Sequence, residues 1–300
     1  MTFTPVAFII FNRPDTTKQV FAEIAKAKPL KLLIIADGPR TNHPEDIEKC
    51  AAARAIIDSV DWDCEVLTNY SDINLGCKDR VSSGLDWVFD TVEEAIILED
   101  DCVPHPTFFR FCEELLEKYR DDKRIAMISG NNFQFGRKRT EYSYYFSRYP
   151  HIWGWASWRR AWKNYDVDMK QWPKIRDSGL LKDLLETKKS VWYWKNRFEN
   201  VYKKNIDSWA YSWTFSCWIQ NALTIIPKVN LVSNIGVGSE ATHTTVQFEF
   251  TNIKNNNMNF PISHPPYIIR DSKADFFVEN KIFSGSVISR IIKRAIDKLK

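Results

Sequence analysis

The sequence predicts an α/β protein in a single large domain, with a mixed, mostly parallel sheet flanked by helices. Short, uniformly apolar runs alternate with amphipathic segments over the first hundred residues, as in parallel sheets that are covered on both faces. Polar residues follow each run. The length of 300 residues and the 44% of hydrophobic residues are ample for a sizeable core.

Strands and helices are expected in strict alternation from the N-terminus. Residues 6–11 form the first apolar run, and residues 14–27, opened by Pro-Asp-Thr-Thr, form the helix after it. Residues 30–36 follow as a strand closed by an Asp-Gly-Pro turn, and residues 45–60 as a helix. A third and a fourth βα-type repeat come next, and the remaining expected elements are strands at 64–68, 95–98, 125–129 and 224–226 and helices around 81–88 and at 107–119.

Ligands of open α/β sheets bind at the carboxyl ends of the strands. The residues at these ends should therefore face one crevice; they are Asn12 and Arg13, Asp37 and Gly38, residues 69–76, and Glu99, Asp100 and Asp101. The nucleotide-binding half is expected to span residues 1–130. Residues 131–280 should form a second functional half, since ten of the twelve tryptophans lie between Trp153 and Trp218; the family resemblance given below implies that this half binds the acceptor.

Three adjacent carboxylates at the end of an apolar strand repel one another unless a cation joins them. A divalent ion such as Mg²⁺ or Mn²⁺ prefers oxygen ligands and bridges to phosphate oxygens. The alternative is a solvated acidic turn. The position after four βα-type strands favours the metal site.

Six blocks resemble bacterial glycosyltransferases related to family 2, a group of the GT-A fold in which some members are labelled "hemolytic protein". The triplet resembles the EDD form of the metal-binding DxD-type motif in N-acetylglucosaminyltransferase I. The resemblance spans roughly residues 5–245, and its blocks are FNRP (11–14), ADGPR (36–40), NLGCKDRVSSGLDWVF (74–89), ILEDDCVPHPTFF (97–109), YPHIWGWASWRRAW (149–162) and NLVSNIGVGSEATHT (230–244).

This resemblance implies a role for each strand-end residue. Arg13 and Asp37 match positions that contact the base of a uridine diphosphate sugar, and Arg80 a position near the nucleotide. Asn12 lies beside Arg13 in the same expected nucleotide site. The triplet would divide its work, with Glu99 on the donor sugar, Asp100 on the ribose hydroxyls and Asp101 on the metal.

His243 is a candidate second ligand for the metal or the diphosphate, because similar transferases often bring a C-terminal histidine back to the metal. Gly236 and Gly238, just upstream, allow close approach of the backbone. The alternative is a structural histidine. An imidazole ligand suits Mn²⁺ better than Mg²⁺.

Tryptophan rings stack on the apolar faces of sugars, and their N–H groups reach hydroxyls. Trp153, Gly154 and Trp155, at an expected loop-to-helix junction, are therefore predicted to form a wall for the donor or acceptor sugar. Trp158 and Trp162 follow Trp155 at helical spacing and are expected in the core.

Inverting transfer needs a carboxylate that takes the proton of the acceptor hydroxyl. Asp207 is the expected base; alternatively, it caps the helix that carries Trp209. Similar enzymes can have an acidic residue after the tryptophan, where this chain has Ala210. Glu240 and Asp166 are the substitute candidates.

Residues 284–300 predict an amphipathic C-terminal helix with five basic residues against Asp297. Such a helix suits an anionic membrane surface, or it packs on the domain or on a second subunit. The rest of the chain is close to neutral, which argues against nucleic acid as a partner. The six cysteines have no CxxC pairing and are expected to be reduced.

Together these patterns predict metal-dependent transfer, with inversion, from a UDP-sugar to a glycan or glycolipid of the bacterial envelope. We expect a cytoplasmic enzyme, with peripheral contact to the inner face of the cytoplasmic membrane as an option. Two rivals are a sugar-nucleotide pyrophosphorylase and a non-enzymatic membrane-active protein. The first should carry a glycine-rich basic loop after strand one, which FNRPDTTKQV lacks. The second leaves the acidic triplet unexplained.

Overall fold

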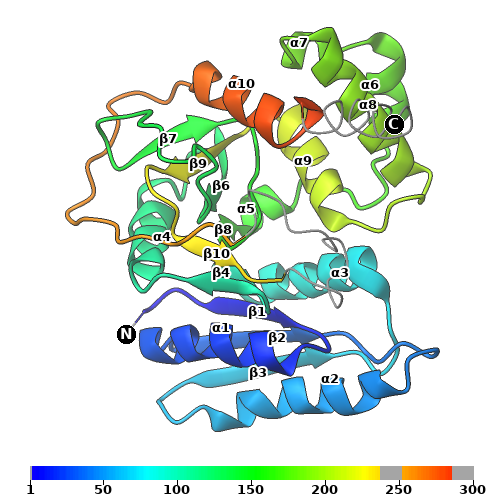
Figure 1. Ribbon diagram of the computed structural model, residues 1–300, viewed down its shortest axis with the longest axis vertical. Coiled ribbons are helices and arrows are strands. Elements are labelled where there is room, and N and C mark those ends of the chain that lie inside the picture. The colour runs from blue at the N-terminus through cyan, green and yellow to red at the C-terminus, as the bar shows by residue number, and fades with distance from the viewer. Residues whose placement is uncertain (1, 237–251, 286–300) are drawn as a thin grey trace, which may run out of the picture.

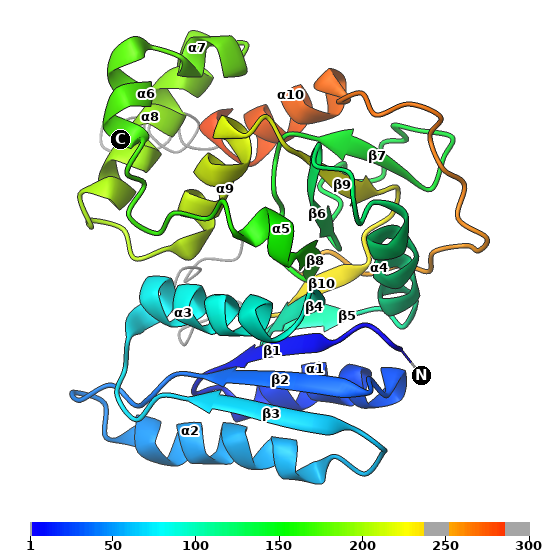
Figure 2. The same ribbon diagram turned by 180° about the vertical axis from the view of Figure 1, so that it is seen from behind.

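A mixed, mostly parallel eight-stranded sheet runs through the whole molecule, with helices on both faces (Figures 1 and 2). The computed structural model describes residues 2–236 and 252–285. The α/β class predicted from the sequence is confirmed. In sheet order the strands are β3 (Glu65–Tyr70), β2 (Lys31–Ala36), β1 (Val6–Ile10), β4 (Glu94–Glu99), β8 (Trp155–Trp158), β6 (Ile125–Ser129), β9 (Leu223–Pro227) and β7 (Tyr144–Ser147).

The first four strands pair in parallel because helices or turns return the chain to the same end each time. β1 throughout and β2 from Leu32 onward are buried and apolar, as strands covered on both faces must be. The helices of this half are α1 (Pro14–Ala27), α2 (Glu45–Ala55) with the 3₁₀ turn η1 (Ile56–Ser59), α3 (Gly76–Thr91) and α4 (Thr107–Lys118).

Two hydrophobic cores lie on the two faces of the sheet. On one face, α1 and α4 contribute Phe21, Ile24 and Phe108. On the other, α3 packs Leu85 among tryptophans of the second half. That half adds α5 (Arg159–Trp162), α6 (Trp172–Ser178), α7 (Leu181–Leu184), α8 (Lys188–Tyr202), α9 (Trp209–Ile219) and α10 (Ser272–Lys281), with β5 (Cys102–Pro104) and β10 (Val232–Asn234) pairing as a small antiparallel sheet.

The expected helix that starts at Trp155 is wrong, because Trp155–Trp158 is strand β8. This strand inserts antiparallel between β4 and β6, so that Trp155 pairs with Ile97 and Ser129. Only a four-residue helix, α5, follows it. Spacings of three and four residues fitted a helix, yet the main chain gains ladder hydrogen bonds on both sides in the sheet.

None of the helices in the described ranges combines the length and the apolar character that crossing a membrane requires. The predicted amphipathic helix at 284–300 lies almost wholly outside the described residues, which end at Gly285.

Candidate functional site

The carboxyl ends of β1, β2 and β4 meet at one edge of the sheet, and polar residues follow each of them. Because β1 pairs with β2 on one side and with β4 on the other, the residues after β1 lie between those that follow these two strands. Arg13 follows β1, Asp37 follows β2, and the acidic triplet begins at the last residue of β4.

A guanidinium joins the adjacent carboxylates. Arg13 donates from Nη2 and Nε to Asp100 and from Nη1 to Oδ2 of Asp101, the last at 3.0 Å. The backbone N–H of Phe11 also donates to Asp100. Burial opposes the charge of Arg13, but the two aspartates more than offset it and raise its pKa. The prediction that Arg13 contacts the base is not supported by this geometry, since its side chain turns to the triplet.

Glu99 is the member of the triplet with a buried oxygen that accepts no hydrogen bond from the described residues. That oxygen is Oε1. Burial raises the pKa of Glu99, and the neighbouring charges of Asp101 and Asp100 raise it further. Burial also raises the pKa of Asp100, although Arg13 opposes that shift. An orphaned acceptor in a polar edge of the sheet is suited to a ligand hydroxyl or a cation.

Asp101 also accepts a hydrogen bond from β10, the strand that follows the tryptophan-rich segments. Asn234, at the end of β10, donates from Nδ2 to Oδ1 of Asp101 at 3.0 Å. A Cβ on Gly236 would lie 2.0 Å from Oδ2 of Asp101, so no side chain fits there. Close approach at Gly236 was predicted from the sequence. Asn234 was missed, and its only signal was a polar residue ending an apolar run.

Asp37 holds a loop of its own protein instead of presenting a free carboxylate. Its oxygens accept from the N–H groups of Gly38, Leu75 and Gly76 and from the amide of Asn74, at 2.9–3.1 Å. These four bonds use the four acceptor sites of a carboxylate. Burial raises its pKa despite them. The structure therefore gives Asp37 a positioning role, and its contact to a base stays a prediction.

Arg80 and Asn12 also bind protein groups. Arg80 is buried and donates to the carbonyl of Ala36 and to Asn69, at the carboxyl ends of β2 and β3. Asn12 donates from Nδ2 to the buried carboxylate of Asp46 at 2.7 Å. Both residues lie at the predicted edge, but their side chains tie strands and helices together there.

Asp207 caps the start of α3. It was predicted either to act as a base or to cap the helix that carries Trp209, and its contacts match neither prediction. Its carboxylate accepts from the N–H groups of Cys77 and Lys78 at 3.0 and 2.8 Å, in the first turn of α3. With Asp37 on Leu75 and Gly76, two carboxylates satisfy four consecutive N–H groups at this helix start. The residue before α9 itself is Ser208. A role of Asp207 as a catalytic base stays a prediction.

The strand ends and Asp207 converge on one thiol. Burial raises the pKa of Cys77, and the charges of Glu99, Asp207 and Asp37, followed by Asp101, raise it further. These carboxylates come from three different parts of the chain. Carboxylates from both halves of the molecule therefore lie near the start of α3.

The three residues of the predicted sugar wall, Trp153, Gly154 and Trp155, have different surroundings in the structure. Trp155 is fully buried and packs against Trp209 and Trp213, so its assignment to a sugar wall is wrong. Gly154 has φ 65°, and a Cβ there would lie 2.6 Å from Val232. Trp153 is only partly buried and donates its backbone N–H to Asn131, leaving its role a prediction. Trp158 and Trp162 are buried, as expected.

The remaining candidates for base and metal lie elsewhere. Asp166 accepts from the N–H groups of Asp168 and Lys170 and stabilises a turn before α6. Glu240 and His243 lie outside the described residues. Within residues 2–236 and 252–285, no three His, Cys, Asp or Glu side chains form a closed metal site.

The residues of the edge nevertheless fit a Mg²⁺ or Mn²⁺ ion. Such an ion is usually held by one or two carboxylates together with substrate phosphates, and does not need a closed protein cage. Glu99 has a buried oxygen without a partner among the described residues. The carboxylate of Asp101 is close enough for its charge to raise the pKa of Glu99. These two carboxylates supply the oxygen donors that the ion prefers.

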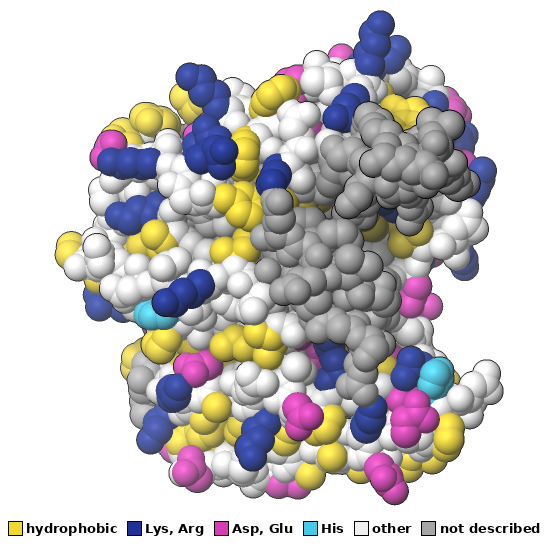
Figure 3. Space-filling view, in the orientation of Figure 1, with side chains coloured by type: hydrophobic (Ala, Val, Ile, Leu, Met, Phe, Trp, Pro, Cys, Tyr) yellow, Lys and Arg dark blue, Asp and Glu magenta, His cyan; other side chains and the backbone are white. Residues whose placement is uncertain are grey.

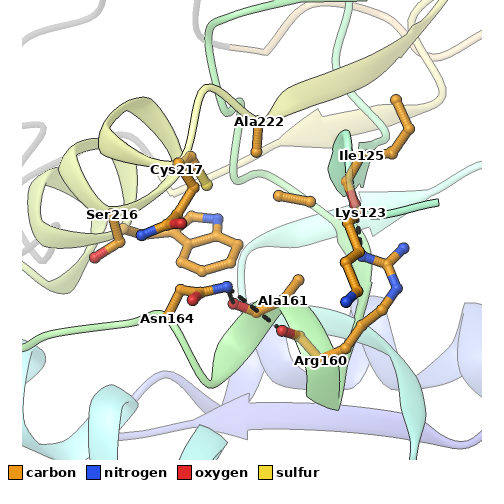
Figure 4. A pocket seen from close by; sticks show the side chains of 11 residues that line it. Lys123, Ile125, Arg160, Ala161, Asn164, Ser216, Cys217 and Ala222 are labelled. Carbon is orange, nitrogen blue, oxygen red and sulfur yellow. Dashed lines mark hydrogen bonds between the residues drawn. The ribbon is translucent and has the colours of Figure 1, made fainter. Parts of the chain in front are cut away.

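A cavity of about 350 Å³ lies away from this edge, between α5, α9 and the start of β6. Figure 4 shows Lys123 and Arg160 on one side of it and Asn164 on the other. Arg160 donates to the carbonyls of Tyr119, Arg120 and Ile125. β6 runs in the same direction as β4, so the cavity lies at the amino edge of the sheet and is separate from the triplet.

No protein-family profile and no curated protein matches the chain. Among solved structures, a UDP-glucose pyrophosphorylase complexed with UDP-glucose is similar at 10% identity, covering 54% of this chain and 79% of that one, with a TM-score of 0.31. A 4-diphosphocytidyl-2C-methyl-D-erythritol synthase from Anaerococcus prevotii is 10% identical over 66% and 99% (TM-score 0.30). An inositol-1-phosphate CTP transferase from T. maritima is 6% identical over 54% and 74% (TM-score 0.30). At these scores the likenesses assign no activity to the chain.

Proposed function

We propose that this protein is a glycosyltransferase that takes its sugar from a nucleoside diphosphate sugar, with a divalent metal ion as cofactor. One observation carries the proposal. Glu99 holds a buried acceptor oxygen that has no partner among the described residues, beside two aspartates that share a guanidinium, at the carboxyl edge of parallel strands. Ligands of open α/β sheets bind at this edge, and hydroxyls and cations are the groups that such an oxygen takes.

The residues divide into those that face the ligand and those that fix the edge. Glu99 accepts a hydrogen bond from a hydroxyl of the donor sugar. Asp101 and Glu99 together would hold the metal. When bound, the ion acts as a Lewis acid for the departing diphosphate. Arg13 keeps Asp100 and Asp101 in place through its hydrogen bonds. A ribose contact from Asp100 stays a prediction, because its oxygens already accept from Arg13 and Phe11.

The other parts of the proposal come from the resemblance of the sequence. They are a uridine diphosphate as the nucleotide, inversion at the anomeric carbon, and a glycan or glycolipid of the bacterial envelope as acceptor. The tryptophan-rich half would face the acceptor, with Trp153 as its most exposed candidate within the WGW segment.

A sugar-nucleotide pyrophosphorylase remains the competing activity for the same edge. Its phosphate loop should follow the first strand and carry glycine. In this chain only Phe11, Asn12 and Arg13 separate β1 from α1, and the last two side chains bind carboxylates of the protein. This short connection favours glycosyl transfer.

The test is turnover of a panel of UDP-, GDP- and CDP-sugars with Mn²⁺, with and without added pyrophosphate. We expect nucleoside diphosphate to be released from a UDP-sugar without pyrophosphate, and Glu99→Gln and Asp101→Asn each to lower the rate by about a hundredfold or more. Asp168→Asn, at an exposed turn, is the matched control. Formation of UTP only when pyrophosphate is present would replace the proposal with the pyrophosphorylase.

A further inference from the structure

Basic and aromatic side chains gather on a surface that the proposed site does not use. We define the α10 patch as residues 135–139 together with the outward face of α10. Figure 3 shows Lys and Arg side chains around hydrophobic ones over β7 and α10, in the upper left of the view. The members that matter are the cations Arg137, Arg139, Lys273 and Lys281 and the rings Phe135, Phe276 and Phe277.

The acidic and the basic side chains of α10 lie on opposite faces of the helix. Asp275 and Glu279 point inward, where Asp275 accepts from Ser147 and Glu279 from Tyr149 and Trp194. Lys273 and Lys281 are exposed on the other side of the helix. The two carboxylates of this helix thus point into the protein, and its lysines lie on the exposed face.

Ring contacts join the loop to the helix. Phe135 meets Phe277 edge-on at 6.3 Å between ring centroids. The guanidinium of Arg137 lies over the Phe277 ring at 4.2 Å from its centroid, and that of Arg139 at 5.6 Å. These contacts fix the cations close to the aromatic rings.

Phe276 is 51% exposed, although burying such a ring is normally favourable. A soluble polyanion would recognise the cations and leave this ring unexplained. A membrane interface accounts for both, because cations bind anionic headgroups while aromatic rings enter the boundary with the acyl chains.

We propose that the α10 patch docks the protein on an anionic membrane surface. This surface is distinct from residues 284–300, whose basic amphipathic pattern follows directly in the sequence. Hydrogen bonds from Ser147, Tyr149 and Trp194 hold the inner face of α10 against the domain. The proposal is independent of the activity at the acidic edge.

The experiment is co-sedimentation of the full chain with vesicles of phosphatidylcholine alone or mixed with phosphatidylglycerol. We expect binding only to the mixed vesicles. Arg137→Ser and Lys273→Ser should each weaken it about fivefold, since a cation near such a surface contributes ~1 kcal/mol. Phe276→Ser should weaken it as well, at every salt concentration. The matched control is Trp192→Ser with Lys195→Ser, an exposed ring and a cation on α8.

Two further substitutions and one soluble probe separate membrane docking from loss of fold and from polyanion binding. Phe276→Trp with Lys273→Arg keeps the chemistry of the patch and should keep the binding, which a merely misfolded protein would not do. Wild-type affinity in the Arg137, Lys273 and Phe276 serine variants would overturn the proposal. So would equal binding to heparin and to mixed vesicles with no effect of Phe276→Ser, which would identify a soluble polyanion as the partner.

Discussion

At the carboxyl edge of β1 and β4, two carboxylates share one guanidinium, and a third has a buried oxygen without a partner in the part of the chain that the structure describes. Behind β8, by contrast, the indoles of Trp155, Trp162 and Trp213 pack on one another with ring centroids 5.2–6.3 Å apart. The first region keeps unfavourable charge inside the protein. The second buries mainly apolar area, although Nε1 of Trp155 is a buried donor without a hydrogen bond in the described ranges. Stability and ligand chemistry are therefore expected in different halves of the molecule, and substitutions should separate them.

The largest loss of stability is expected from Trp155→Ala. The side chain is fully buried among three other indoles, so truncation leaves a large cavity. We expect the free energy of unfolding to fall by about 3–5 kcal/mol. Urea denaturation followed by circular dichroism measures this. Trp192→Ala, at an exposed ring, is the control, and equal effects of the two would contradict the assignment of Trp155 to the core.

The aromatic half also contains buried acids, and one of them is Asp275, whose pKa burial raises to about 7. An acid with a raised native pKa stabilises the fold least once it is ionised, so stability should fall as pH rises from about 4 to about 7, by up to about 4 kcal/mol. Asp275→Asn should flatten this pH dependence, whereas Asp168→Asn, at an exposed turn, should not. Identical slopes for wild type and Asp275→Asn would contradict the burial of the charge.

At the acidic edge, Arg13→Met should destabilise the fold by about 3 kcal/mol, because it leaves Asp100 and Asp101 without their cation. Thermal unfolding at neutral pH measures the loss. Arg124→Met, which breaks an exposed pair with Asp122, is the control. Adding Asp100→Asn to Arg13→Met should restore part of the stability; a further loss would mean that Arg13 acts mainly by packing.

Glu99→Gln should do the opposite and stabilise the fold, on the order of 2 kcal/mol at neutral to alkaline pH. The amide keeps the shape and removes a carboxylate whose ionisation burial opposes. Urea denaturation checks the gain, with Glu48→Gln on an exposed face of α2 as the control. A gain in stability together with loss of turnover is the signature of a ligand site, and a loss of stability would assign Glu99 to the scaffold.

The smallest effect is expected from Asp207→Asn, which removes one of two acceptors at the start of α3. Loss of a helix cap costs about 1 kcal/mol. The melting temperature measures this, with the exposed Asp58→Asn as the control. Were the variant fully stable but inactive, Asp207 would return as the catalytic base.

The first hundred residues were predictable because their strands are short, apolar and followed by turn residues. Pro14 marks the first residue of α1, and the apolar run 6–11 differs from β1 by a single residue. The helix expected at 45–60 is α2 continued by η1. The location of the acidic triplet at a shared strand edge followed from the same reasoning.

The partners of the polar residues were not predictable. Arg13 lies 87 positions from Asp100, and Asp207 lies 129 from Lys78, so no local pattern records these pairs. For the same reason the sequence suggested a metal as the cation of the triplet, whereas Arg13 also serves there. Trp155 was misread because tryptophan spacing fits a helix and a strand alike, and pairing with β4 and β6 decided the outcome.

The helix start shared by Asp37 and Asp207 makes the two halves thermodynamically linked. One carboxylate follows β2 in the first half and the other precedes α9 in the second, and both hold the same turn of α3. A ligand that shifts either carboxylate changes how tightly the other is bound, in both directions and by the same free energy. The two aspartates should accordingly show a measurable interaction energy in a double-mutant cycle, even though no hydrogen bond joins them directly within the described residues.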